Sequence, residues 1–145
     1  MSDIIPFPLS EKKLKEDIRK AELKQDFDKM YELFEQYESQ FELDEALSIK
    51  KCDMLYQMGA FLELREEAII LLKQGLNKYD ELMIFYVKSL NGLEQYYESV
   101  EVINQIIDEV RDHKTRMELF PLKEYAQSKL DSNREQLTHS LAQFN

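Results

Sequence analysis

Apolar residues recur along the chain with helical spacing, and the pattern itself repeats. Phe27, Phe61 and Tyr96 lie 34 and 35 positions apart, and each is followed three, seven and ten places later by residues that are apolar with one exception. This spacing corresponds to one face of an α-helix. The three runs are Phe27, Met30, Phe34, Tyr37; Phe61, Leu64, Ala68, Leu71; and Tyr96, Ser99, Ile103, Ile106.

A second stripe with the same offset precedes each aromatic residue. Its members are Leu14, Ile18, Ala21; Ser48, Cys52, Leu55; and Met83, Val87, Leu90. Between the two stripes lie the aligned pairs Gln25-Asp26, Gly59-Ala60 and Glu94-Gln95. Gly59 indicates a tight turn, because glycine adopts left-handed backbone conformations without a side-chain clash. Asn91-Gly92 is expected to do the same in the third copy.

These patterns predict an all-α fold made of antiparallel helix pairs. The expected helices, in pairs, are 11–24 with 27–40, 44–57 with 61–74, and 79–92 with 96–111. The corresponding segments are an extended N-terminal arm at 1–10, three repeats at 11–40, 44–74 and 79–111, and a C-terminal helical cap or divergent fourth repeat at 114–145.

Both ends of the chain carry further apolar residues. Pro6 and Pro8 favour an extended arm that either docks onto the first repeat or serves as a segment for another chain. In the C-terminal region, Pro121 predicts a kink or the start of a helix, and the capping-box spacing of residues 132–135 predicts a last helix. A last apolar stripe is expected either to cap the repeats or to join two copies into a dimer: Leu137, Leu141 and Phe144.

A period of 34 residues, one helix pair per period and a Gly-x-aromatic sequence at the turn resemble the tetratricopeptide repeat family over residues 11–111. The resemblance implies a right-handed superhelical array of helix hairpins, a solenoid whose concave surface is lined by the first helix of each pair. An irregular helical bundle is the alternative. The chain lacks the family's repeat-ending proline and places larger residues at most interlocking positions, so we expect an altered curvature. Those positions hold Ile18, Cys52, Val87; Met30, Leu64, Ser99; and Tyr37, Leu71, Ile106.

The resemblance also implies a scaffold or adaptor that binds a protein segment in the concave groove. The candidate groove residues are Lys12, Lys15, Arg19, Ile49, Asp53, Tyr56, Ile84, Lys88 and Asn91. We expect the cations on the first helix to hold an acidic group and the apolar residues to contact apolar side chains. Solvated helix charges are the alternative interpretation. The family's clamp for a terminal carboxylate is mostly missing, since Arg19 and Lys50 stand where asparagine is expected.

Composition narrows the possible partners. The chain has 145 residues and a formal net charge of -10, which opposes binding to nucleic acid or to anionic membranes. No apolar run approaches the length of a membrane span. The single cysteine, Cys52, excludes an internal disulfide framework and lies at an apolar position, so we expect it to be structural. These features predict an acidic, cytoplasmic protein.

No pattern of catalytic or metal-binding residues is present. His113 and His139 have no ligand spacing to each other or to Cys52. We therefore expect no enzymatic activity, metal or cofactor. The leading hypothesis is a non-enzymatic protein–protein interaction module. The alternatives are a peptide-sensing or regulatory protein and a homodimerising structural protein that uses its terminal helices.

Overall fold

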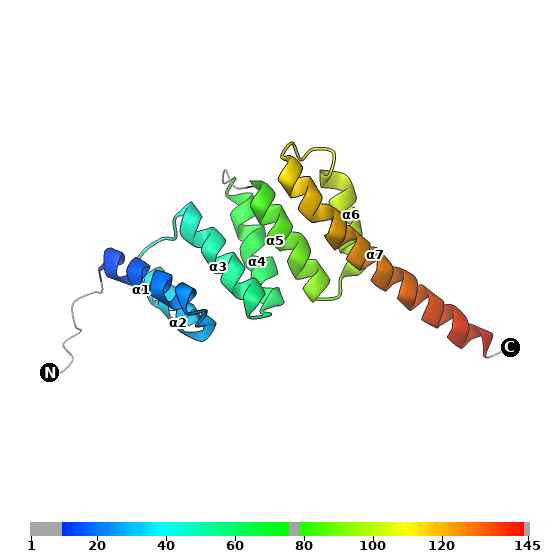
Figure 1. The fold of residues 1–145 in the computed structure, drawn as a ribbon, viewed down its shortest axis with the longest axis horizontal. Helices are drawn as coiled ribbons and strands as arrows, with labels where there is room; N and C mark the ends of the chain where they lie inside the picture. Colours follow the sequence, from blue (N-terminus) through cyan, green and yellow to red (C-terminus); the bar gives the residue numbers. More distant parts are fainter. Residues whose placement is uncertain (1–9, 76–78, 144–145) are drawn as a thin grey trace. The chain divides into compact units, whose positions relative to one another are not determined.

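A computed structural model describes residues 10–75 and 79–143, and all regular structure in these ranges is helical (Figure 1). The helices are α1 (Glu11–Leu23), α2 (Phe27–Glu38), α3 (Glu45–Gln57), α4 (Phe61–Lys73), α5 (Tyr79–Gly92), α6 (Tyr96–Ile106) and α7 (His113–Ala142). The predicted all-α fold is confirmed for this part of the chain. None of these helices is long and apolar enough to cross a membrane. The predicted N-terminal arm lies outside the described residues, except for Ser10.

The first six helices follow the predicted boundaries closely. Five begin at the predicted residue, and α3 begins one residue late. Helix α6 differs most, because it ends at Ile106 rather than at residue 111. The chain turns there so that Val110 is buried and its carbonyl accepts a hydrogen bond from Arg116 Nε at 2.7 Å. Tertiary packing has therefore shortened the helix that the apolar spacing alone would extend.

Short polar side chains define several helix starts. Ser10 Oγ accepts from the Lys13 amide at 3.0 Å, and Asp44 Oδ1 accepts from the Leu47 amide at 2.8 Å. Each such bond satisfies a backbone donor that has no partner in the first helical turn. The residues with this role are Ser10, Asp26, Asp44 and Asp112.

The chain divides into two compact units, Met1–Met58 and Gly59–Asn145, so the second predicted repeat is shared between them. In unit 1, α1 and α2 form an antiparallel hairpin. Tyr37, near the end of α2, donates a hydrogen bond at 2.8 Å to Glu11, at the start of α1. Helix α3 packs against α2. The largest fully buried side chains of this unit are Leu14, Ile18, Met30, Phe34, Tyr37, Met54 and Leu55.

In unit 2, α5 is the central helix, and it contacts α4, α6 and α7. Helices α6 and α7 also pack against each other. This arrangement explains why α5 is buried on nearly all sides, whereas α4 and α6 each bury one stripe. One core cluster comprises Met83, Ile84, Val87, Ile103, Ile106, Val110 and Leu119.

The predicted turns share one backbone geometry. Gln25, Gly59 and Glu94 have φ angles of 55°, 73° and 62°, so all three repeat-equivalent positions are left-handed. The residues that follow them, Ala60 among them, have φ between -91° and -84° and ψ between 62° and 80°. Gly92 is not the turn residue that the sequence suggested, because it is the last residue of α5. The sequence repeat therefore has a counterpart in the backbone.

Hydrogen bonds at the first and third turns also correspond. The amide of Asp26 donates to the carbonyl of Ala21 at 2.9 Å, and the amide of Gln95 donates to that of Leu90 at 2.8 Å. This bond across six residues is typical of a helix that ends in a left-handed residue. The two residue pairs are offset by 69 positions, which is two repeats of 34 and 35.

The predicted stripes are interior. Of their 21 positions, 18 are buried, and the remaining three are the aromatic residues Phe27, Phe61 and Tyr96, all partly exposed. Equivalent positions in the three copies thus have equivalent burial. The periodicity correctly identified the inward face of each of the first six helices.

The C-terminal segment departs from the prediction. A single 30-residue helix, α7, replaces the two expected helices, with Pro121 inside it. A proline removes one helical hydrogen bond and frees the carbonyl four residues earlier, here that of Met117. Both residues lie on the exposed side of α7, where water can satisfy that carbonyl. Residues 132–135 continue the helix and cap nothing.

The expectation that the last stripe caps the repeats is wrong for its described members. Helix α7 buries Thr115, Leu119 and Ala126, but every described residue from 131 onward is exposed. Leu137 and Leu141 are 61% and 58% exposed. Phe144 lies outside the described residues. Only the first half of α7 therefore belongs to the core of unit 2.

Candidate functional site

Two ion pairs connect α1 and α3 within unit 1. Lys15 Nζ lies 3.3 Å from Asp44 Oδ2, at the start of α3, and Glu22 Oε1 lies 3.0 Å from Lys50 Nζ. The earlier residue on α1 pairs with the earlier residue at α3, and the later with the later. Helices α1 and α3 therefore run in the same direction. Six predicted groove residues therefore lie on neighbouring helices: Lys12, Lys15, Arg19, Ile49, Asp53 and Tyr56.

Lys15 forms ion pairs within the protein. Besides Asp44, its ammonium contacts Glu11 Oε1 at 3.4 Å. The hydrogen bond to Asp44 raises the pKa of Lys15. The Leu47 amide and then Lys15 lower the pKa of Asp44. The predicted role of Lys15 as an anion ligand overlooked a carboxylate at the start of the next helix.

Lys12 and Arg19 differ from Lys15. Both side chains are exposed, and neither forms an ion pair with another described residue. They are seven residues apart on α1, or about 10 Å at the helical rise of about 1.5 Å per residue. These two cations are therefore accessible on one side of the helix.

Helix α3 contributes the apolar part of the site. Ile49 and Tyr56 are partly exposed and also seven residues apart, and exposed Asp53 lies between them. We call the surface formed by Lys12, Arg19, Ile49, Asp53 and Tyr56 the α1–α3 surface. It combines two accessible cations with a partly apolar row, which suits contact with a peptide rather than catalysis.

The predicted groove residues of unit 2 have different environments. Ile84 and Asn91 are only 5% and 8% exposed, so they are interior residues and not groove residues. Asn91 Nδ2 donates to the carbonyl of Leu122 at 3.2 Å, which links this face of α5 to α7. Lys88 is partly exposed, and its ammonium lies 5.6 Å from the centre of the Phe85 ring. The apolar spacing of the C-terminal segment indicated that it has a buried face, but not that this face would pack against α5.

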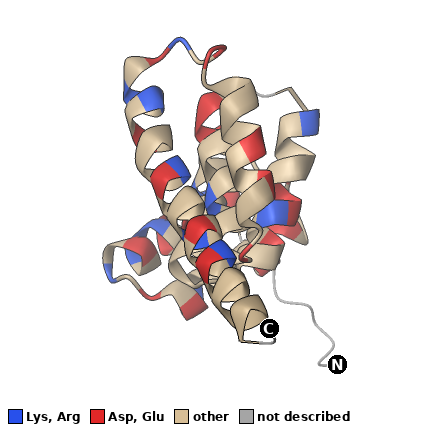
Figure 2. Cartoon of the chain, turned by 90° about the vertical axis from the view of Figure 1, so that its right-hand side faces the viewer, with Lys and Arg blue, Asp and Glu red and all other residues tan. Residues whose placement is uncertain are grey.

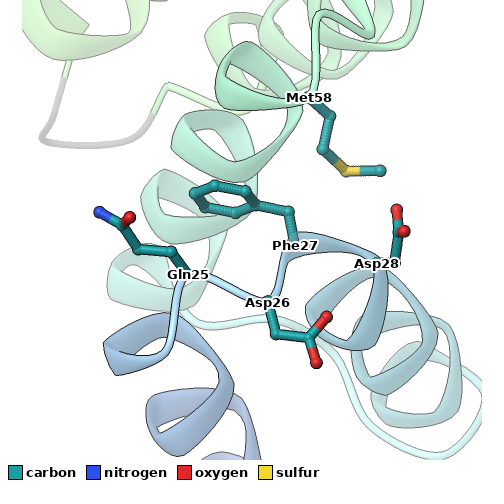
Figure 3. Close-up of a pocket in the computed structure, with 5 residues that line it drawn as sticks. All are labelled: Gln25, Asp26, Phe27, Asp28 and Met58. Carbon is teal, nitrogen blue, oxygen red and sulfur yellow. The ribbon is translucent and has the colours of Figure 1, made fainter.

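A hollow that sequence reasoning missed lies at the turn between α1 and α2 (Figure 3). It has a volume of about 320 Å³ and is lined by Gln25, Asp26, Phe27, Asp28 and Met58. In Figure 3 the side chains of Asp28 and Met58 lie on the same side of the turn. Asp26 is already engaged, because its Oδ1 accepts from the Lys29 amide at 3.2 Å. The lining contains no serine, cysteine, lysine or histidine.

Cys52, the single cysteine of the chain, is fully buried on α3. Among the residues with described positions, no group of three or more His, Cys, Asp or Glu side chains could hold a metal ion. His113 and His139 are both exposed and belong to α7.

No protein-family model matches the chain, and comparisons with curated proteins and with solved structures found no match. The resemblance to tetratricopeptide repeats stays a prediction that rests on the residues themselves. What the fold adds is an all-helical chain whose three turns share one backbone geometry.

Proposed function

We propose that the chain is a non-enzymatic interaction module of tetratricopeptide-like helix pairs, which binds an acidic segment of another protein on the α1–α3 surface. The observation that carries this proposal is the pair of exposed cations, Lys12 and Arg19, which form no ion pair with another residue of the described ranges, in a chain of net charge -10. The shared geometry of the three turns supports the repeat architecture. The single buried cysteine supports a cytoplasmic location.

The other cations in the body of α1 show why this pair stands out. Lys13 pairs with Asp17 at 3.0 Å, Lys20 pairs with Glu16 at 3.5 Å, and Lys15 contacts two carboxylates. Lys12 and Arg19 also have carboxylates nearby on α1, but neither forms an ion pair with another described residue. Both cations can therefore attract an anionic group of a ligand.

The spacing of the cations suggests the form of the ligand. Lys12 and Arg19 are about 10 Å apart along α1. A peptide in the polyproline II conformation has three residues per turn and advances about 3.1 Å per residue. Two acidic residues three positions apart in such a segment would therefore project from the same side and reach both cations. Apolar side chains of the same segment would contact Ile49 and Tyr56. Each charged hydrogen bond is worth about 1.5–3 kcal/mol when shielded from water, and less at an exposed site.

A displayed peptide library enriched in Glu-x-x-Glu sequences tests this proposal. Binding of the selected peptides is measured by fluorescence anisotropy for the wild type and for Lys12→Gln/Arg19→Gln. We expect a loss of about tenfold or more in affinity, and weaker binding as salt increases. The matched control is Lys13→Gln/Lys20→Gln, which removes the same charge from the same helix but from cations that are already paired. Equal binding by both variants, or no selected peptide, would contradict the proposal.

A further inference from the structure

The apolar stripe of α7 continues beyond the part of the helix that packs in unit 2. Leu119 and Leu137 are 18 residues apart, which is five turns of about 3.6 residues, so they project from the same side. Leu119 is fully buried, whereas Leu137 is 61% exposed. Figure 1 shows the second half of α7 extending past α6 toward the C-terminus. The same helical face is thus covered in one half and uncovered in the other.

Burial along this face ends between Leu130 and Leu137. Leu119 and Ala126 are buried, Leu122 and Leu130 are partly exposed, and Leu137 and Leu141 are exposed. The six apolar members of the stripe are Leu119, Leu122, Ala126, Leu130, Leu137 and Leu141. The exposed end therefore continues an existing packing face, the one that α5 and α6 already cover in the first half of α7.

The charge of this segment indicates what could cover it. Residues 136–143 contain no Asp, Glu, Lys or Arg, although 33% of the chain is charged. Figure 2 shows the last turns of α7 in tan for this reason. The preceding residues 127–135 have two bases and two acids, so the net charge of 127–143 is zero, in a chain of -10. Two copies of an acidic protein repel each other over most of their surfaces, but not here.

We propose that residues 131–143 of α7 form a self-association surface that packs antiparallel against the same segment of a second copy. A twofold contact uses the same surface on both copies, and the exposed segment is centred on Leu137. An axis at this position brings Leu137 against Leu137 of the second copy. The neutrality of the segment favours a like partner over a strongly charged one.

The contact is small. A helical segment of 13 residues covers much less than the roughly 800 Å² per partner that stable complexes bury. Association is therefore weak and depends on protein concentration. It also stabilises the helix, since an isolated helical segment of about 13 residues is marginal in water. This surface lies on a different helix from the α1–α3 surface and does not depend on the proposed peptide ligand.

Sedimentation velocity from about 10 to about 500 µM tests the proposal, because a weak dimer dissociates over such a range. We expect the mean mass of the wild type to rise toward that of a dimer, and that of Leu137→Glu/Leu141→Glu to remain monomeric. Asn104→Glu/Gln105→Glu is the matched control. It adds the same charge at exposed residues of α6, outside the proposed surface, and should associate as the wild type does. A wild type that stays monomeric, or equal association by both variants, would overturn the proposal.

Cross-linking tests the antiparallel arrangement separately. With a short bis-maleimide reagent, Leu137→Cys should give covalent dimers, because both copies place this residue at the axis. His139→Cys, on the other face, should give few. Native Cys52 is fully buried and contributes little. Equal yields from the two positions would contradict the arrangement. Retained peptide binding by these variants would separate this outcome from a failure of the proposed function.

Discussion

The ring of Phe61, at the start of α4, lies directly against the backbone of Gly92, the last residue of α5. A Cβ atom at position 92 would overlap this ring. The requirement for glycine here comes from space and not from φ, because Gly92 lacks the left-handed backbone of Gly59 and Gly75. The contact fixes how closely the two helices approach in unit 2.

Gly92→Ala is therefore expected to destabilise the protein by about 1–2 kcal/mol. Alanine favours a helix over glycine by up to about 1 kcal/mol. Overpacking against an aromatic ring held between helices costs about 1–3 kcal/mol, so the overpacking is the larger effect. Urea unfolding followed by circular dichroism measures the effect. In a Phe61→Leu background the penalty should shrink, and an unchanged penalty would show that the ring is not its cause.

At the left-handed turn residues we expect a substitution to increase the stability of the protein. Gln25 and Glu94 adopt positive φ at positions equivalent to Gly59. A left-handed conformation costs a residue with a side chain about 1–2 kcal/mol, and glycine gives back part of this through the entropy of the unfolded chain. We expect Glu94→Gly to raise the free energy of unfolding by about 0.5–1 kcal/mol, and Gly59→Ala to lower it by about 1 kcal/mol. A destabilised Glu94→Gly protein would refute this explanation.

Ser99 is a polar residue in an apolar stripe. It is fully buried, and its hydroxyl has no hydrogen-bond partner among the described residues. Removing an unsatisfied buried hydroxyl should be favourable, so we expect Ser99→Ala to stabilise the protein by about 1 kcal/mol in thermal or urea unfolding. Ser89 provides the control, because its hydroxyl donates to the Tyr86 carbonyl at 2.6 Å. Ser89→Ala should therefore gain less than Ser99→Ala.

Acid should weaken unit 1 through Asp44. Its pKa lies below the ordinary value because the Leu47 amide and Lys15 stabilise the carboxylate. In the unfolded chain the pKa of an aspartate is about 3.9, and in the folded protein the pKa of Asp44 is lower. The carboxylate therefore stabilises the fold fully above about pH 3.9, and this stabilisation is lost as the pH falls through the folded-state pKa. We expect Asp44→Asn to be less stable at pH 7 and to show a smaller loss between about pH 4 and about pH 2. Urea midpoints measured across this range test it, and identical pH profiles would contradict it.

The sequence predicted the first six helices, their buried faces and the turns between them, because these features depend on the local periodicity of apolar residues. The repeat offset predicted the turns at Gln25, Gly59 and Glu94, because each turn lies between two apolar stripes. The stripes themselves predicted the buried face of each helix. The sequence did not predict the burial of Ile84 and Asn91, because a helical period does not reveal which later helix will cover a given face. The ion pair of Lys15 was not predicted for a similar reason. Its partner Asp44 belongs to a different helix start, 29 residues away.

Hydrogen exchange along α7 can show whether its uncovered end is free or occupied. Amide protons of residues 131–143 should exchange with solvent rapidly in dilute solution, whereas those around Leu119 and Ala126 are protected by the core of unit 2. If a second molecule occupies that end, exchange there should slow as the solution is concentrated. Deuterium uptake along one helix would then distinguish a free end from an occupied one without any label or substitution.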